Sequence, residues 1–250
     1  MGISYSSFNK SQAGELPGTT EKHTQNQYSL DLMAGINDQV MLTATIPYVT
    51  KSLSVTGDSP INTRGIGDID LGATYQFKAG VKDKVLFGTL VDVKLPTGRN
   101  ALSDGSGRMD EHTQLGTGST DLSVGFLATT EDHQKNLWFA GLRGRWNGRN
   151  GTGYHYGNAA FYNVGVSKDL NSASSLVLEL NGRLAAHDRT DTGDLDPDSG
   201  GHFGYLSVSY RREMGPQTGL IASYQIPVIH RLNGTQSESG LLTFGIFTKF

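Results

Sequence analysis

Alternation of apolar and polar residues with a period of two recurs along the 250-residue sequence, and it constrains the fold more than any other feature. In one segment, Leu176, Leu178 and Leu180 share one parity while Glu179 falls on the other. Successive side chains of a β-strand point to opposite faces, so each such segment predicts a strand with one apolar face. The predicted strands, about twelve in number, span residues 2–8, 27–36, 38–49, 67–77, 83–95, 120–128, 137–146, 160–168, 175–185, 205–212, 219–228 and 241–250.

The connectors between these segments alternate between short and long. Short ones lie at residues 131–136 and 169–174, whereas long ones occupy residues 96–118 and 187–201. A soluble β-sandwich has no reason to sort its connectors in this way. A transmembrane barrel does, because short turns face the periplasm and long loops face the outside.

Aromatic residues gather near both ends of the predicted strands, as the interfacial girdles of a membrane barrel require. Tyr154 and Tyr156 also lie near long connectors, and the same interfacial position is expected for them. A soluble antiparallel barrel with an inward apolar face and a ligand cavity is the alternative fold. The expected girdle residues are Tyr48, Tyr75, Phe77, Trp138, Trp146, Tyr210 and Phe250.

Composition narrows the class further. The sequence has no cysteine, and its formal net charge of −3 argues against a nucleic-acid partner. Apolar runs are far shorter than the roughly 18 residues that a membrane helix needs. We therefore predict an all-β protein: a single domain over residues 1–250 that forms a transmembrane antiparallel up-and-down β-barrel of about twelve strands in the bacterial outer membrane.

The final segment, LLTFGIFTKF, places Leu242, Phe244, Ile246 and Phe250 on one parity. This pattern resembles the C-terminal signal by which the assembly machinery recognises bacterial outer-membrane proteins. It predicts that machinery and outer-membrane lipid as partners of a barrel that we expect to be monomeric. The signal concerns location and carries no information about a solute.

Three stretches resemble one family more closely. They are GIGDIDLGATYQF from residue 65, DVKLPTG from residue 92 and GTGSTDLSVGF from residue 116. In this order they are similar to the outer-membrane proteins of the "meta-pathway of phenol degradation" family. The resemblance implies a channel or transporter for a small solute, hydrophobic and aromatic compounds included. We expect neither enzymatic activity nor a cofactor. It carries no functional residues over to this chain.

Charged residues of the inward parity are the candidate lumen residues, because a charge facing lipid at mid-depth costs several kcal/mol. Acidic groups dominate the earlier strands and arginines the later ones, so the two sets could face each other across the lumen. They would either form a field that orients solutes in a pore or pair into a plug that makes the barrel a structural or interaction protein. The candidates are Asp31, Asp68, Asp70, Asp92, Lys94, Asp121, Arg143, Arg145, Glu179, Arg183, Arg211 and Lys249.

The sequence raises two further kinds of site, a calcium site and a lipid-hydrolase site. The loop at residues 187–201 is rich in aspartate, and closely spaced carboxylates suit Ca²⁺, although a solvated acidic loop is the preferred interpretation. A membrane-embedded lipid hydrolase would need a serine, a histidine and an orienting residue within reach, and His155 forms no such motif. The calcium candidates are Asp191, Asp194, Asp196 and Asp198, with Asp188 in the same loop.

Overall fold

The computed structural model describes residues 1–14, 18–78, 85–105 and 107–249. Strands dominate it, and a single 3₁₀ turn, η1, lies at Glu111–Thr113. Among the described residues, no helix is long and apolar enough to cross a membrane. The strands are β1 Gly2–Ala13, β2 Thr20–Gly35, β3 Val40–Val55, β4 Ile61–Ile66, β5 Ile69–Lys78, β6 Val85–Leu95, β7 Ser103–Asp104, β8 Gly107–Arg108, β9 Asp121–Glu131, β10 Leu137–Trp146, β11 Ala159–Asn171, β12 Ser174–Ala185, β13 Gly201–Glu213, β14 Thr218–Leu232, β15 Ser237–Glu238 and β16 Leu241–Thr248.

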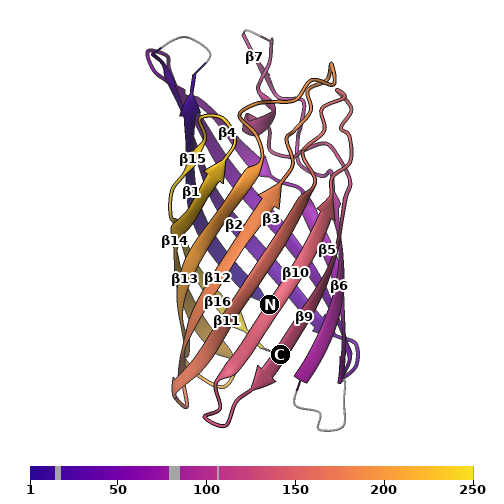
Figure 1. Cartoon of the computed structure of the whole chain (residues 1–250), viewed down its shortest axis with the longest axis vertical. Coiled ribbons are helices and arrows are strands. Elements are labelled where there is room, and N and C mark those ends of the chain that lie inside the picture. The colour runs from indigo at the N-terminus through magenta and orange to yellow at the C-terminus, as the bar shows by residue number, and fades with distance from the viewer. Residues whose placement is uncertain (15–17, 79–84, 106, 250) are drawn as a thin grey trace.

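The main sheet closes on itself. Its order is β15-β1-β16-β14-β13-β12-β11-β10-β9-β6-β5-β3-β2, and β1 also pairs with β2. Because β4 continues into β5 and β15 continues into β16, the sheet forms a closed antiparallel barrel of 12 strands. The strands run steeply tilted around a central lumen (Figure 1). The fold predicted from the alternating pattern is confirmed.

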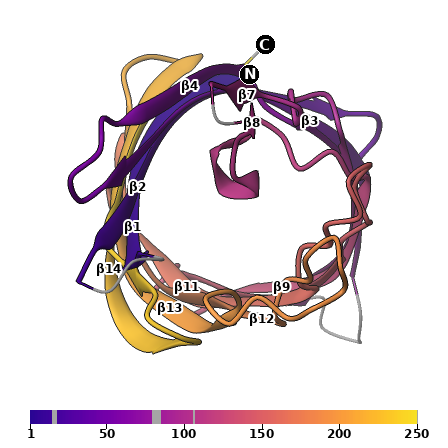
Figure 2. The same ribbon diagram turned by 90° about the horizontal axis from the view of Figure 1, so that it is seen from above.

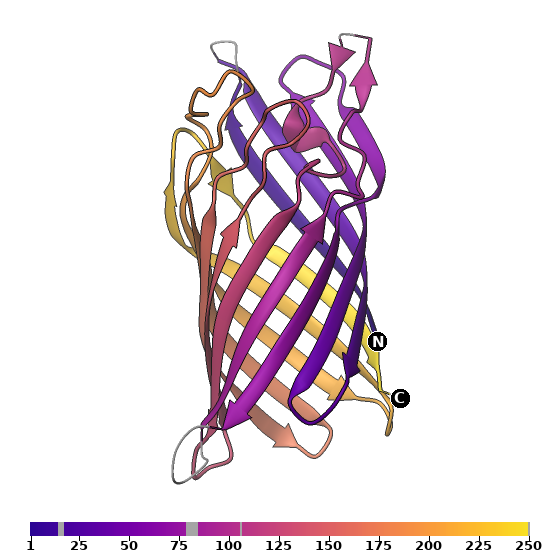
Figure 3. The same cartoon turned by 90° about the vertical axis from the view of Figure 1, so that its right-hand side faces the viewer.

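Connections at the two ends of the barrel differ in length, as the sequence predicts. Long loops crowd one end, whereas short turns and both marked chain ends lie at the other (Figures 1 and 3). We call the first end extracellular and the second periplasmic, following the usual arrangement of such barrels. A further short connector is predicted at residues 78–84, and all of it but Lys78 lies outside the described residues.

The outer surface of the strands is apolar. On β12, for example, Leu176, Leu178 and Leu184 are 39%, 46% and 48% exposed on the parity that the sequence assigns to lipid. Tyr48, Tyr75, Trp138, Trp146 and Tyr210 are also exposed aromatic residues of this surface. Phe77 stacks between Tyr75 and Phe87, with ring centroids 6.0 Å apart in both pairs. Phe250 lies outside the described residues.

Two breaks in the barrel wall shape the extracellular end. Between β4 and β5 the chain leaves the ladder at Gly67 and Asp68, and between β15 and β16 it does so at Ser239 and Gly240. A register shift between β13 and β14 opposes Gly204 to Ile229 and Tyr205 to Pro227, so Val228 forms a bulge. Such irregularities change the direction of side chains locally. The two breaks place Asp68 and Glu238, respectively, inside the extracellular half of the barrel.

Candidate functional site

The long loop between β6 and β9 folds back into the barrel. Figure 2 shows η1, which this loop carries, within the ring of strands. The Lys51 ammonium donates to the main-chain oxygens of His112, at 3.1 Å, and Gln114, and the Thr63 hydroxyl donates to Thr113 O at 2.7 Å. The Gln114 side chain is wholly buried. Its amide oxygen accepts a hydrogen bond from Leu102 N, and its amide nitrogen donates one to Leu102 O. The inner part of the loop, residues 111–116, is therefore held against the barrel wall and largely buried.

A buried ion cluster anchors the base of this loop. Asp68 accepts hydrogen bonds from Gly98 N at 3.0 Å, from Thr117 N at 2.8 Å and from the Thr117 hydroxyl at 2.9 Å. Lys94 lies 3.4 Å from Asp68 and 2.5 Å from Asp121, and all three side chains are at most 12% exposed. Each acid thus has several partners, and the cluster joins the interrupted strand to the loop.

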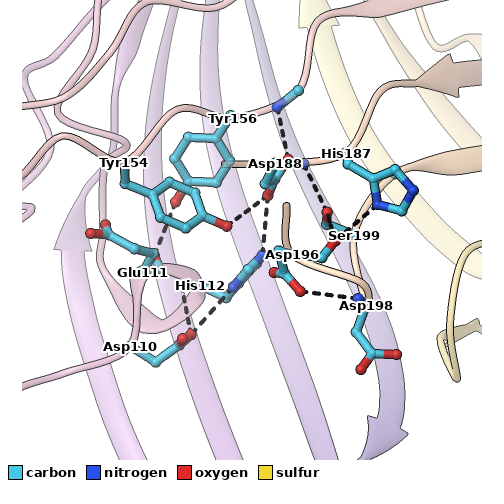
Figure 4. Close-up of polar contacts among 12 residues, drawn as sticks. Asp110, Glu111, His112, Tyr154, Tyr156, His187, Asp188, Asp196, Asp198 and Ser199 are labelled. Atoms are coloured by element: carbon cyan, nitrogen blue, oxygen red, sulfur yellow. Dashed lines mark hydrogen bonds and ion pairs between the residues drawn. The ribbon is translucent and has the colours of Figure 1, made fainter. Parts of the chain in front are cut away.

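The extracellular mouth is joined by a second network, drawn in Figure 4. Asp188 accepts from the Tyr154 hydroxyl at 2.9 Å and from Gly157 N at 2.7 Å, and it lies 3.8 Å from the His112 ring. The Tyr156 hydroxyl donates a hydrogen bond to the main-chain oxygen of Glu111 on η1, at 3.2 Å. Three long loops therefore meet at one point. The interfacial position predicted for Tyr154 and Tyr156 is wrong, because both rings point into the mouth.

Two kinds of pKa shift mark this network. Burial, together with the neighbouring carboxylates, raises the pKa values of Tyr154 and Tyr156 well above the ordinary range, so both phenols remain neutral donors. For Asp110, partial burial acts to raise the pKa. Its hydrogen bonds and charge contact with His112 outweigh that effect and lower the pKa to about 2. The His112 ring lies 3.4 Å from Asp110 and so links Asp110 to Asp188.

Below the folded loops, the lumen holds a chamber of about 410 Å³. Its wall is made by the neighbouring strands β6, β9, β10, β11, β12 and β13. Glu238 of β15, which precedes the break before β16, also lines it. Gly141 lets the Asn163 side chain lie close to the main chain of β10, since a Cβ at Gly141 would lie 2.4 Å from the Asn163 side-chain oxygen. The chamber residues are Leu90, Leu127, Gly141, Leu142, Arg143, Phe161, Tyr162, Asn163, Asn181, Gly182, Arg183, Phe203, Tyr205 and Glu238.

One cross-strand row dominates the chamber wall. Arg143, Phe161 and Arg183 oppose one another directly on β10, β11 and β12. The Arg143 guanidinium lies 4.7 Å from the centroid of the Phe161 ring, and that of Arg145 lies 5.0 Å from the same centroid. Both distances fall within the range of cation–π attraction. Arg183 forms an ion pair with Glu238, to which the Tyr205 hydroxyl also donates, at 3.2 Å.

The periplasmic end of the lumen is built differently. A second space of about 510 Å³ is lined there by Asp31, Arg211 and Lys249, among others. Asp31 accepts from the hydroxyls of Ser4, at 3.3 Å, and Thr45, at 2.8 Å. Arg211 lies over the Phe247 ring, 4.2 Å from its centroid. These groups are only partly buried, and no long loop covers them.

The predicted lumen residues thus fall into three groups. Asp68, Lys94 and Asp121 form the buried cluster under the loop, and Asp31, Arg211 and Lys249 lie at the periplasmic end. The remaining residues occupy the wall between them: Asp70, Asp92, Arg143, Arg145, Glu179 and Arg183. Arg143 lies 3.7 Å from Asp92, but this pair spans only β9, so it follows the wall and does not cross the lumen as the sequence analysis anticipated.

The acidic loop does not gather its carboxylates. Asp196 accepts from Asp198 N, Asp198 accepts from Thr235, and Asp191 and Asp194 bond Thr192. Within the part of the chain that the structure describes, no three acidic, histidine or cysteine side chains are close enough to hold a metal ion. The geometry gives the calcium interpretation no support, and the Asp188 of this loop belongs to the mouth network.

Sequence reasoning missed the apolar part of the chamber and its acid. Phe161 and Leu127 lie on the parity that the alternating pattern assigns to the lumen. An apolar residue on this otherwise polar parity could have indicated an apolar part of the lumen wall. Lys10 and His23, which line a smaller space of about 190 Å³ beside η1, were also missed, because both lie between the predicted strands 2–8 and 27–36, where no parity was assigned. Glu238 had no such signal, because it lies in a connector and reaches the lumen through the break before β16.

A closed barrel with an apolar outer surface and a charged lumen defines the class of outer-membrane β-barrel proteins. Residues 12–228 match the family model described as "Putative MetA-pathway of phenol degradation", and the chain belongs to this family. The resemblance found in the sequence is therefore confirmed. A search of curated proteins gives no match.

Several solved structures have a fold similar to that of this chain. The chain is similar to the COG4313 outer membrane channel from Pseudomonas putida F1, with a TM-score of 0.73 and 13% identity over 99% of this chain and 95% of that one. The translocator domain of the autotransporter NalP from Neisseria meningitidis gives 0.57 and 13% over 100% and 88%. The CymD monoaromatic hydrocarbon channel gives 0.50 and 9% over 100% and 88%. At these identities the likeness shows the fold.

Proposed function

We propose that the protein is an outer-membrane channel that passes a small solute through its charged lumen. The observation that carries this proposal is the chamber of about 410 Å³ bordered by Arg143, Phe161 and Arg183. Its volume is within the range of small-molecule sites, and it combines an apolar surface with a few polar groups, as such sites do. A lumen filled only to stabilise the wall would not need this space.

The chamber favours a solute with an apolar body. Leu90, Leu127 and Phe161 supply apolar surface beside the charged groups. A hydrophobic or aromatic solute agrees with this lining and with the family resemblance. The CymD channel, described as a channel for monoaromatic hydrocarbons, shares the fold and supports the same solute class.

Planar-bilayer recording of the purified barrel tests the proposal. We expect a small, steady single-channel conductance, and we expect vesicles that contain the barrel to swell in small neutral solutes faster than empty vesicles. A matched sample of heat-unfolded protein controls for leaks caused by detergent. A barrel that inserts fully but carries no current and admits no solute would contradict channel function.

A plugged structural or interaction barrel is the second candidate, and the folded loop supports it. Lys51 and Thr63 hold η1 inside the mouth, and Asp188 joins it to two further loops. In that case the exposed outer parts of the loops would carry the function. The same recordings separate the candidates, because a plugged barrel conducts only after its loop is released.

The remaining expectations extend the proposal. A channel of this kind needs no enzymatic activity, and the lipid-hydrolase alternative gains no observation of its own from the described residues. We expect a monomer in outer-membrane lipid, assembled by the machinery that reads the C-terminal strand. Light scattering of the solubilised barrel, corrected for detergent, measures the oligomeric state.

A further inference from the structure

The charges that the chamber exposes are not balanced. Arg143 and Arg183 line it with 40% of each side chain exposed, whereas the Glu238 side chain is only 2% exposed. Glu238 is already engaged by Arg183 and by the Tyr205 hydroxyl. A solute in the chamber therefore meets exposed guanidinium groups and a concealed carboxylate.

Arg143 is the group with donor capacity to spare. Its nearest carboxylate, on Asp92, is 3.7 Å away, so the contact between them is long and weak and leaves most of the guanidinium donors free. Its other contact is the face of Phe161, which attracts the cation but accepts no conventional hydrogen bond. A guanidinium placed in this way can bind an incoming carboxylate through two parallel hydrogen bonds.

The surface beside Arg143 is apolar. Leu90 and Leu127 lie on neighbouring strands, and the absence of a side chain at Gly141 lets Leu127 and Asn163 lie close against the main chain there. An apolar body can therefore occupy the chamber while a charged group reaches Arg143. Resting on the proposed channel function, we infer that the chamber binds organic monoanions in which a carboxylate is attached to a compact apolar body, in preference to neutral hydrocarbons and to small hydrophilic anions.

The experiment compares four probes as blockers of the small-ion current: benzoate, benzyl alcohol, benzylammonium and acetate. For the unmodified channel we expect benzoate to block at a concentration about tenfold or more below that of each other probe, as one charge-assisted hydrogen-bonded contact permits. The Arg143→Gln variant should lose this preference, and Arg143→Lys should keep part of it.

The matched control is Arg211→Gln. Arg211 also lies over a phenylalanine ring in the lumen, but at the periplasmic end and outside the chamber. This variant should keep the preference for benzoate. If benzoate blocks no better than benzyl alcohol, or if Arg211→Gln removes the preference as fully as Arg143→Gln, the inference is overturned while the channel proposal stands.

Calorimetric titration of benzoate into the detergent-solubilised barrel separates the two proposals. If the unmodified barrel carries no current yet binds benzoate in an Arg143-dependent way, channel function fails and the chamber is a binding site. If current flows without such binding, the inference fails alone. Folding of each variant is checked by its shift in mobility on unheated gels, and Arg143→Lys keeps the test decisive if the glutamine variant does not fold.

Discussion

The two ends of the lumen are built from the same kinds of residue but differ in burial. At the extracellular end, Gln114 and Ser119 are at most 2% exposed, and the Asp121 side chain is 3% exposed. At the periplasmic end, the side chains of Arg211 and Lys249 are 43% and 55% exposed. Charged side chains that are solvated at one end are thus part of a packed core at the other.

This difference decides what each end can do. Removing one member of a buried, multiply bonded ion cluster leaves its partner uncompensated and costs about 3–5 kcal/mol. Exposed pairs such as Lys249 with Glu213 contribute little to stability, because water screens their charges. We therefore expect the extracellular end to control the opening of the lumen and the periplasmic end to be an open vestibule.

The strongest test of this comparison is Asp68→Ala. The change removes the acceptor of three hydrogen bonds and a charge partner of Lys94, so we expect a loss of about 3–5 kcal/mol in unfolding free energy in lipid vesicles. Release of the loop should also raise single-channel conductance severalfold. The matched change Asp31→Ala, at the other end, should cost about 1 kcal/mol. Equal effects of the two changes would remove the distinction between the ends.

A second test compares an arginine substitution on the lipid-facing side of β12 with one on its lumen-facing side. Leu178→Arg should destabilise the barrel by about 2–4 kcal/mol, because an arginine at mid-depth then faces hydrocarbon. Val177→Arg is the control, since its neighbours across the ladder are Ser167 and Ser209, which leave room in the lumen. Reversible urea unfolding in vesicles measures both. A neutral Leu178→Arg would reverse the assigned parity.

A third test compares selectivity at the two ends. The double change Arg143→Gln and Arg145→Gln removes two positive charges that act on Asp70 and Asp92, so the reversal potential in a salt gradient should shift towards cations. The double change Arg211→Gln and Lys249→Gln should shift it less, because water screens the exposed groups. If the arginine change near the chamber instead raises conductance from near zero, these residues act as a latch.

The smallest expected effect concerns pH at the mouth. Because the pKa of Asp110 is lowered to about 2, its stabilising contribution is complete above its unfolded value of 3.8 and is lost as pH falls towards 2. Current fluctuations from loop opening should therefore increase only between about pH 4 and pH 2. Asp110→Asn should show the fluctuations without this pH dependence. An onset near pH 6 in the unmodified protein would assign them to histidine.

The sequence predicts the wall of the barrel far better than its mouth. Period-two alternation assigns Leu178 to lipid and Arg143 to the lumen without any knowledge of partners, because strand geometry fixes the face. It contains no information on where a long loop folds. Tyr154 and Glu111 are buried and Tyr156 is partly buried because the loop returns into the barrel, a tertiary event that local spacing does not encode.

The chamber, too, was only partly predictable from the sequence. Parity alone puts Phe161 and Arg183 inside, but the acid that pairs with Arg183 is Glu238, 55 residues further along the chain, in a stretch that the sequence predicts to be a connector and that forms β15. Only the register of the closed sheet and the break before β16 bring them together. The arginine side of the chamber was therefore predictable, and its acid and its folded roof were not.

The closure between β1 and β16 has a consequence for assembly kinetics. The joint pairs Gly2–Ser7 with Leu242–Phe247, so its partners lie at opposite extremes of the sequence and its contacts carry the largest loop-closure entropy in the barrel. Hairpins between neighbouring strands can form early, but this seam has to form last. Until then an open sheet in lipid would expose two rows of unpaired amide and carbonyl groups, each costing several kcal/mol. The chain must therefore either insert and close in one concerted step or borrow a strand edge from another protein until its own edges meet.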